Sequence, residues 1–226
     1  MKTRIVYEDS DIIVINKPAG LATQTAKIGQ ADVVSELKNY LAGENRKESP
    51  FLGIIHRLDQ PVEGLLVFAK NKKAAAKLSG QMNKQYYAVF CGKPCSREAE
   101  LVDYLIKTPD NRAEVADIDT KDARKAVLRY KLIRTIQKSG EEISLVDVEI
   151  DTGRFHQIRV QMSHAGMPLL GDMKYSDERA KSCSLKLEVK TVALCAYRLA
   201  FIHPVTGKQM EFTIKPSGMA FEDFKL

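Results

Sequence analysis

The chain has 226 residues, of which 44% are hydrophobic, enough to fill one substantial core. Its 35 Lys and Arg against 29 Asp and Glu give a formal net charge of +6, which suits a polyanionic partner without identifying one. No apolar run of about 18 residues occurs, and the first residues lead straight into a strand-like segment. We therefore expect neither a membrane span nor a secretory signal, and we expect a cytoplasmic protein.

The first third of the chain alternates predicted strands with one predicted helix. Residues 4–8 and 12–16 have strand-like runs, and residues 32–41 have helical spacing that ends at Gly43. Residues 51–55 and 65–69 have the length and composition of buried strands. Between these two strands, Pro61 and Gly64 are expected to break the chain and leave a short polar loop. After them, Asn71 is expected to cap a helix that runs to Met82.

The remaining two thirds consist mainly of further predicted strands. They cover residues 85–91, 101–106, 126–133, 143–150, 194–202 and 209–214. The polar stretches 43–50 and 109–125 are expected to be loops. Because regular strand–helix alternation is absent, the pattern favours an α+β fold with a largely antiparallel sheet.

The loop between the two buried strands carries Arg57 and Asp59 in the sequence His-Arg-Leu-Asp-Gln-Pro (residues 56–61). Loops held by rigid strands often carry active-site residues, so Asp59 is a candidate catalytic carboxylate. The alternative for an isolated loop acid is that Asp59 caps the loop and Arg57 is its surface partner. A second polar cluster downstream favours the catalytic interpretation.

That second cluster is the segment Asp-Thr-Gly-Arg-Phe-His-Gln-Ile-Arg (residues 151–159). Thr152 is a candidate N-cap of a helix expected to continue to Gly166, on which His156 and Arg159 would share a face. Residues 153–161 contain no acid. The cluster therefore predicts a surface that faces an anion, either a phosphate or a catalytic carboxylate.

The cysteines and histidines show no metal-binding spacing. Cys91 and Cys95 are four residues apart, Cys183 and Cys195 are twelve apart, and neither spacing is the close pair of a zinc ribbon. We therefore expect no metal and no disulfide in a cytoplasmic chain.

Five segments in order resemble the motifs of the RluA family of RNA pseudouridine synthases. Residues 56–59 with 64–70 resemble its aspartate motif, Lys-Gln-Tyr-Tyr-Ala (84–88) its tyrosine motif, and Thr-Gly-Arg-Phe-His-Gln-Ile-Arg (152–159) with 166–172 its basic motif. Residues 7–20 and 200–207 resemble the two terminal signatures. The resemblance spans nearly the whole chain and implies a mixed, mostly antiparallel central sheet with flanking helices and a catalytic cleft.

The resemblance also implies a reaction and roles for residues. It implies that uridine in structured ribosomal or transfer RNA is isomerised to pseudouridine without a cofactor, with Asp59, Tyr86 and Arg159 as catalytic residues. Asp59 would be the essential carboxylate, acting by addition to the ribose or by elimination to a glycal, and Arg159 its cationic neighbour. Tyr86 would stack on the flipped uracil and could move a proton, and Arg57 would fill the vacated space in the RNA. The residues expected to contact RNA are Arg57, His56, Arg154, His156 and Gln157.

Residues 1–226 are expected to form a single, monomeric catalytic domain. The aspartate motif begins too early in the chain to leave room for the amino-terminal RNA-binding domain of the S4 type that some family members carry. RNA recognition would then depend on the catalytic domain's own surface.

Four positions depart from the family pattern. Val62 and Glu63 stand where Thr-Ser is usual, Gln161 where histidine is frequent, and Cys195 where histidine is common. Glu63 adds a carboxylate four residues from Asp59 that either faces it or faces solvent. One alternative is therefore a non-catalytic RNA-binding protein on the same scaffold. A metal-dependent phosphoesterase is a weaker alternative, because its carboxylate and histidine ligands are not clustered in the sequence.

Overall fold

The computed structural model describes residues 1–27, 29–43, 49–78 and 82–226. The chain forms two compact units: the first comprises Met1–Lys84 and Ala196–Pro216, and the second Gln85–Cys195 and Ser217–Leu226. Two of the unit boundaries fall inside strands β5 (Met82–Cys91) and β10 (Leu194–Ile202), and the third follows Pro216. The single catalytic domain expected from the sequence stays a prediction, which a single cooperative unfolding transition would support.

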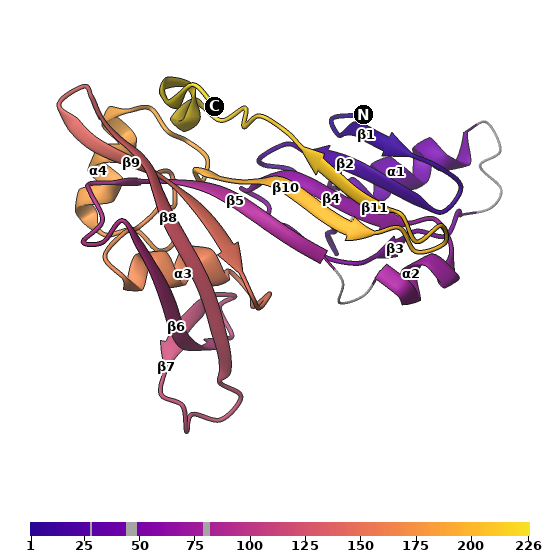
Figure 1. Cartoon of the computed structure of the whole chain (residues 1–226), viewed down its shortest axis with the longest axis horizontal. Helices are drawn as coiled ribbons and strands as arrows, with labels where there is room; N and C mark the ends of the chain where they lie inside the picture. The colour runs from indigo at the N-terminus through magenta and orange to yellow at the C-terminus, as the bar shows by residue number, and fades with distance from the viewer. Residues whose placement is uncertain (28, 44–48, 79–81) are drawn as a thin grey trace. The chain divides into compact units, whose positions relative to one another are not determined.

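The first unit is built on a sheet in the order β1-β2-β4-β10, with β3 paired to β4 and β11 to β10 (Figure 1). The antiparallel pairs include β1 with β2, β2 with β4 and β10 with β11. The strands are β1 (Arg4–Glu8), β2 (Ile12–Lys17), β3 (Gly53–Ile54), β4 (Glu63–Ala69) and β11 (Gln209–Thr213).

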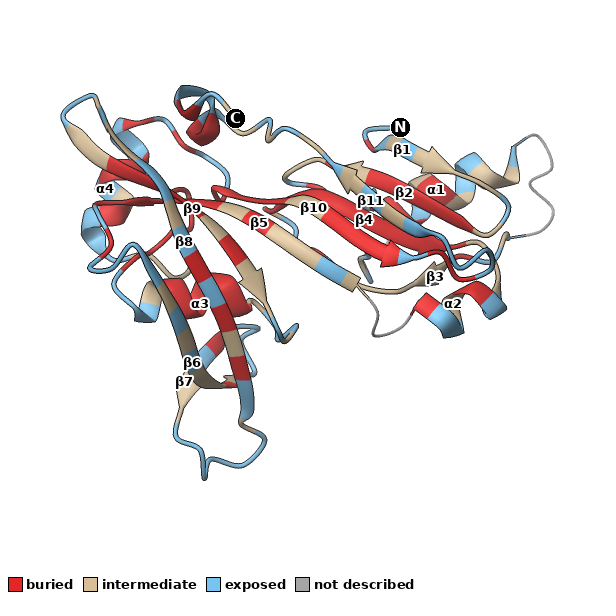
Figure 2. Ribbon diagram, viewed as in Figure 1, coloured by how far each residue is buried: buried red, intermediate tan, exposed pale blue. Residues whose placement is uncertain are grey.

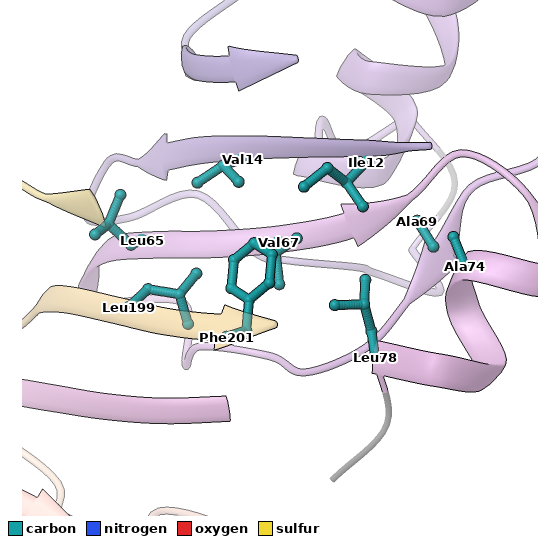
Figure 3. Packing of buried hydrophobic residues seen from close by; sticks show 9 residues of the cluster. All are labelled: Ile12, Val14, Leu65, Val67, Ala69, Ala74, Leu78, Leu199 and Phe201. Carbon is teal, nitrogen blue, oxygen red and sulfur yellow. The ribbon is translucent and has the colours of Figure 1, made fainter. Parts of the chain in front are cut away.

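The core of the first unit lies where β2, β4 and β10 meet helix α2 (Lys72–Leu78). Side chains from these elements form one buried cluster, consisting of Ile12, Val14, Leu65, Val67, Ala69, Ala74, Leu78, Leu199 and Phe201 (Figure 3). Strands β2, β4 and most of β10 are buried along their length (Figure 2). Fully burying each large apolar side chain contributes about 1.5–3 kcal/mol, so this cluster stabilises β4, the strand that follows the Asp59 loop.

The second unit contains the antiparallel series β5-β9-β8-β6-β7 (Figure 1). Its remaining strands are β6 (Glu98–Lys107), β7 (Ala113–Ala116), β8 (Arg124–Lys138) and β9 (Glu141–Ile150). Its helices are α3 (Gln157–His164), α4 (Glu178–Lys186) and the short 3₁₀ helix η1 (Met219–Phe224). The predicted α+β class, with a mostly antiparallel sheet and few helices, is confirmed.

Gly64 does not break the chain, as the sequence had suggested, but lies inside β4. Its φ is +134°, and a Cβ built there would lie 2.5 Å from the backbone nitrogen of Ala196. Glycine is required because β4 and β10 approach closely at this point. The loop that presents Asp59 therefore ends at Val62, and the strand begins at Glu63.

Several element bounds differ from the prediction. The predicted strand 51–55 shrinks to Gly53–Ile54, and Met82 begins β5 instead of ending the preceding helix. Helix α1 (Val33–Ala42) matches: Asp32 is its N-cap, and its Oδ1 accepts from Ser35 N at 2.7 Å. Asn71 caps α2 as predicted, accepting from Ala74 N at 2.8 Å. The predicted loop at 43–50 lies largely outside the described residues, as do residues 79–81.

Helix α3 begins at Gln157, with His156 as its N-cap in the left-handed region (φ 53°, ψ 24°), and ends at His164. The expectation that Thr152 caps a helix reaching Gly166 was therefore wrong. The Thr152 hydroxyl is used elsewhere, accepting from Val127 N at 3.0 Å and donating to Gln157 Oε1 at 2.8 Å. Strand β7 and helices α4 and η1 were not predicted.

Among the described residues, no helix is both long enough and apolar enough to cross a membrane.

Candidate active site

Asp59 is half-buried in a loop that is fastened on both sides. Before it, the Thr23 hydroxyl donates to Leu58 O at 2.8 Å and accepts from Leu58 N at 3.2 Å. After it, Gly20 N donates to Gln60 O at 2.8 Å, and Gln60 Nε2 donates to Gly20 O at 3.0 Å. The segment that follows β2 thus holds the backbone on both sides of the carboxylate.

A buried lysine completes this anchorage. Lys17, at the end of β2, has no exposed surface. Its Nζ donates to three carbonyl oxygens, those of Leu21 at 2.7 Å, Pro18 at 3.0 Å and Gln60 at 3.2 Å. Burial lowers the pKa of Lys17 to about 8, against an opposing effect of the negative charges of Asp59 and Glu63. Lys17 lies within residues 7–20, which resemble the amino-terminal signature of the family, but the sequence indicated no role for this lysine.

Glu63 is buried at the start of β4, which excludes the alternative that it faces solvent. The charge of Glu63 acts on Lys17, as does that of Asp59. The lysine therefore lies within the influence of two carboxylates, the candidate nucleophile and the acid that departs from the family pattern. A buried cation near both reduces the cost of placing two acids in one region.

His56 and Arg57 differ in accessibility. Nε2 of His56 accepts from Val67 N in β4 at 3.3 Å, and its Nδ1 is buried without a hydrogen-bond partner among the described residues. Burial, aided by the charge of Lys84, lowers the pKa of His56 to about 3, so the ring is neutral at physiological pH. Arg57 is exposed, and its guanidinium donates to Gln24 Oε1 at 3.3 Å.

Tyr86 and Tyr87 point to opposite faces of the sheet in the second unit. Tyr86 is buried and pairs with Val148, which pairs with Tyr130 on β8. Helix α3 packs on this same face, where Val160 contacts Ala126 of β8. Tyr87 lies opposite Asp147 on the other face, where a depression of about 390 Å³ is lined by Gln85, Glu98, Ala99, Glu100, Arg129, Tyr130, Lys131, Asp147 and Glu149.

Arg159 of α3 forms a buried two-pronged ion pair with Asp172. Its Nε lies 2.7 Å from Asp172 Oδ2 and its Nη2 2.8 Å from Asp172 Oδ1, and the two side chains are 5% and 1% exposed. The guanidinium carbon also lies 5.0 Å from the centre of the Tyr175 ring. Asp172 thus fixes the plane of the guanidinium. The sequence placed Asp172 in the basic motif without identifying this pairing, which spans 13 residues.

The loop before α3 is organised by Gln157, which is buried. Its Oε1 accepts from Arg154 N at 3.0 Å as well as from Thr152, and its Nε2 donates to Val127 O at 3.0 Å. Arg154 is exposed, with its Nε donating to Lys125 O at 3.0 Å. Of the predicted RNA-contacting residues, Arg57 and Arg154 thus present exposed side chains, whereas the side-chain amide of Gln157 is used internally.

The fold brings together ligand-type groups that are far apart in the sequence. Cys91, Glu141 and Cys183 have ligand atoms within 4.8 Å of one another, as do Asp9, Asp11 and His203. Asp9 is occupied by four donors, the backbone nitrogens of Asp11 and Ile12, the Tyr7 hydroxyl and His203 Nε2. This second group therefore joins the two terminal signatures by hydrogen bonds. The four cysteines are free thiols, and the absence of a metal stays a prediction.

The α+β fold, built on a mostly antiparallel sheet, resembles that of solved structures. The structure resembles Human RNA Pseudouridylate Synthase Domain Containing 1 (TM-score 0.76, 20% identity, covering 95% of this chain and 83% of that one). It also resembles Human RNA Pseudouridylate Synthase Domain Containing 4 (TM-score 0.74, 23% identity, covering 97% and 92%). These likenesses define the fold.

Sequence comparison defines the family. The sequence model of the RNA pseudouridylate synthase family matches residues 11–164, and the chain belongs to this family. Ribosomal large subunit pseudouridine synthase D of Zymomonas mobilis is 35% identical over 219 residues, covering 92% of this chain and 67% of the relative. Dual-specificity RNA pseudouridine synthase RluA of Vibrio parahaemolyticus is 33% identical, covering 89% and 78%. The chain is therefore an RNA pseudouridine synthase, an isomerase that acts on RNA.

Proposed function

We propose that this enzyme isomerises uridine in ribosomal RNA, using Asp59 as its essential carboxylate. The observation that carries the assignment is the anchorage of the Asp59 loop, whose backbone is fastened before and after the carboxylate by residues 17–23. A catalytic group must be held close to its productive geometry, and hydrogen bonds to neighbouring backbone achieve this. If Asp59 only capped its loop, the loop would not need the buried Lys17, which donates to the Gln60 carbonyl.

The reaction is an isomerisation in which the bond between N1 and C1′ of uridine breaks and a bond between C5 and C1′ forms. The proton on C5 leaves to solvent, and N1 gains a proton, so no oxidant, reductant or cofactor is consumed. Asp59 would act on the ribose, by addition to C1′ or by removing a ribose proton to give a glycal. Either route requires the ionised carboxylate.

Arg159 would be the catalytic cation of the second unit. The two-pronged ion pair with Asp172 holds the guanidinium of Arg159 in one plane. Asp172 would then orient the fork, which a lysine at position 159 would not reproduce. Tyr86 would stack against the extruded uracil, and its hydroxyl would be available for proton transfer.

Four of the five residues expected to contact RNA divide into two groups by accessibility. Arg57 and Arg154 are exposed and carry the charge needed to bind phosphate or to fill the space vacated by a flipped base. His56 and Gln157 direct their polar atoms into the protein. For these two we propose the positioning of the Asp59 loop and of the Arg154 loop, in place of RNA contact.

Ribosomal RNA is proposed as the substrate because the name of the Zymomonas mobilis relative refers to the ribosomal large subunit. The name of the Vibrio parahaemolyticus relative indicates dual specificity, so transfer RNA is the second candidate. Pseudouridine mapping in a strain that lacks this protein distinguishes them. Loss of pseudouridine at one or more ribosomal positions, restored by the wild-type gene, is expected. Loss confined to transfer RNA would overturn the ribosomal assignment.

Glu63 departs from the family pattern, and this departure raises the alternative of a non-catalytic RNA-binding protein on this scaffold. Tritium release tests that alternative. Release of tritium from RNA that contains 5-tritiated uridine reports the C5 proton leaving, so it requires catalysis. The purified protein should release tritium in the presence of a chelator, which also tests the metal-dependent alternative. Binding of the same RNA without tritium release would favour the non-catalytic protein.

A further inference from the structure

Phe155 forms an exposed aromatic surface in the second unit. Its side chain is 38% exposed, immediately before α3. One face of the ring stacks on His156, with ring centres 3.8 Å apart and planes 22° apart. The ammonium of Lys107, an exposed residue at the end of β6, lies 4.8 Å from the ring centre. An aromatic ring that remains this accessible on a basic surface has the composition of a nucleic-acid contact.

The ring beneath Phe155 is held in place. His156 Nδ1 is hydrogen-bonded to the Tyr175 hydroxyl at 2.6 Å, and the two rings meet edge-on with centres 5.5 Å apart. The same hydroxyl accepts from Ala113 N at 2.8 Å. The Phe155–His156 stack is therefore supported by strand β7 and by the Tyr175 loop, which makes it a rigid platform with little side-chain entropy left to lose on binding.

The platform is linked to the proposed catalytic arginine. Tyr175, which holds His156, also lies against the guanidinium of Arg159. Phe155 itself is exposed, whereas Arg159 and Tyr86 are buried. The reacting uridine must reach the buried residues, so a base that stacks on Phe155 belongs to a neighbouring nucleotide of the same strand.

Charge around the platform is complementary to RNA. Lys107 and Arg154 are exposed and flank Phe155 in space and in sequence, respectively, and no acid occurs from residue 153 to 161. A lysine side chain has a flexible four-carbon stem, so a base can take the place of the Lys107 ammonium on the ring. The ammonium would then be available to the adjacent phosphate.

We propose that Phe155, supported by His156, stacks an unpaired base that neighbours the target uridine, while Lys107 binds the phosphate of that nucleotide. This inference rests on the proposed function, because it takes RNA as the ligand. The ligand is defined chemically as a single-stranded nucleotide, recognised by its ring face and its charge without regard to base identity. Stacking of this kind tolerates any base, because every base has a π-face.

Fluorescence anisotropy with a labelled single-stranded oligouridylate tests the platform without requiring turnover. Phe155→Ala should weaken the affinity about 5- to 150-fold, the range typical of losing one stacked base, whereas Phe155→Tyr should bind like the wild type. An abasic oligomer with the same phosphates should bind the wild type and Phe155→Ala equally. Ile133→Ala removes a comparably exposed side chain of the same unit (43% exposed) and should leave affinity unchanged.

Lys107→Ala tests the phosphate contact separately. It should reduce the slope of log affinity against log salt by about 0.7, the value for one phosphate of a single strand, while Phe155→Ala leaves the slope unchanged. Unchanged oligouridylate affinity in Phe155→Ala would overturn the proposal. The assay separates this from failure of the proposed catalysis: stacking through Phe155 without tritium release would support the platform alone.

Discussion

The sharpest test of the anchored loop is the replacement of Lys17 by methionine. The substitution keeps the length of the side chain and removes both the charge and the three bonds to the carbonyls of Pro18, Leu21 and Gln60. Because Lys17 is a buried amine with a lowered pKa, the stability of the wild type should rise with pH relative to that of the variant.

The expected change in the free energy of unfolding follows from the lowered pKa of Lys17. The pKa is about 8 in the folded chain against 10.5 for an unperturbed lysine. Between these values the unfolded chain binds more protons than the folded one, so stability rises with pH. The cost of the buried charge, about 3.4 kcal/mol, is fully present below pH 8 and is removed as the pH approaches 10.5. Between pH 7 and 9.5 the wild type should therefore gain about 2 kcal/mol relative to Lys17→Met.

Urea unfolding of both proteins at these two pH values measures the gain, because the difference cancels other groups that titrate in the same range. Lys72→Met, which removes an exposed lysine of α2, is the matched control and should run parallel to the wild type. The free energy of unfolding of the wild type minus that of Lys17→Met should rise with pH. A value that stays constant or falls as the pH rises would refute the buried-amine argument.

Further predictions concern other parts of the fold. Tyr86→Phe should bind RNA but lose most tritium release, whereas Tyr87→Phe should lose about 1 kcal/mol of stability, measured by urea unfolding, and keep its rate; the reverse result would show that the motif is out of register. Gly64→Ala should destabilise the chain by roughly 3 kcal/mol or more, because its Cβ would meet the Ala196 backbone, while Gly153→Ala, which meets nothing within 4 Å, should be nearly neutral in the same assay. A thiol reagent should label Cys95 alone in the native protein, since the other three cysteines are buried and burial, together with a hydrogen bond to Cys91, raises the pKa of Cys183 to about 12. Rapid labelling of a second thiol would contradict that burial.

The strands and the α+β class could be predicted because their signals are local. The apolar run at 12–16 and the alternation of apolar and polar residues at 143–150 each predict a strand by themselves. The helical spacing of residues 32–41 likewise predicts helix α1. Helix α4 was not predicted from the sequence, because its buried residues are Ala180, Cys183 and Ser184. These small side chains differ little in hydrophobicity from those of the exposed face.

The arrangement of the site was less accessible because it depends on contacts between distant segments. Gly64 is indistinguishable in sequence from a turn glycine, and only the proximity of Ala196 shows why it is needed. Arg159 could be identified as a cation, but its two-pronged pairing with Asp172, which makes the planar fork matter, could not. The burial of Lys17 and Glu63 in one charged group likewise arises from tertiary packing.

The central claim is that Asp59 performs the chemistry, and Asp59→Asn tests it most directly. The amide preserves the shape of the side chain and removes the reactive anion, so single-turnover tritium release should fall by several orders of magnitude while RNA affinity stays within a few-fold of the wild type. The variant should also unfold at the same urea concentration as the wild type, which shows that the loop is intact. An Asp59→Asn protein that keeps a tenth of the wild-type rate would contradict the account.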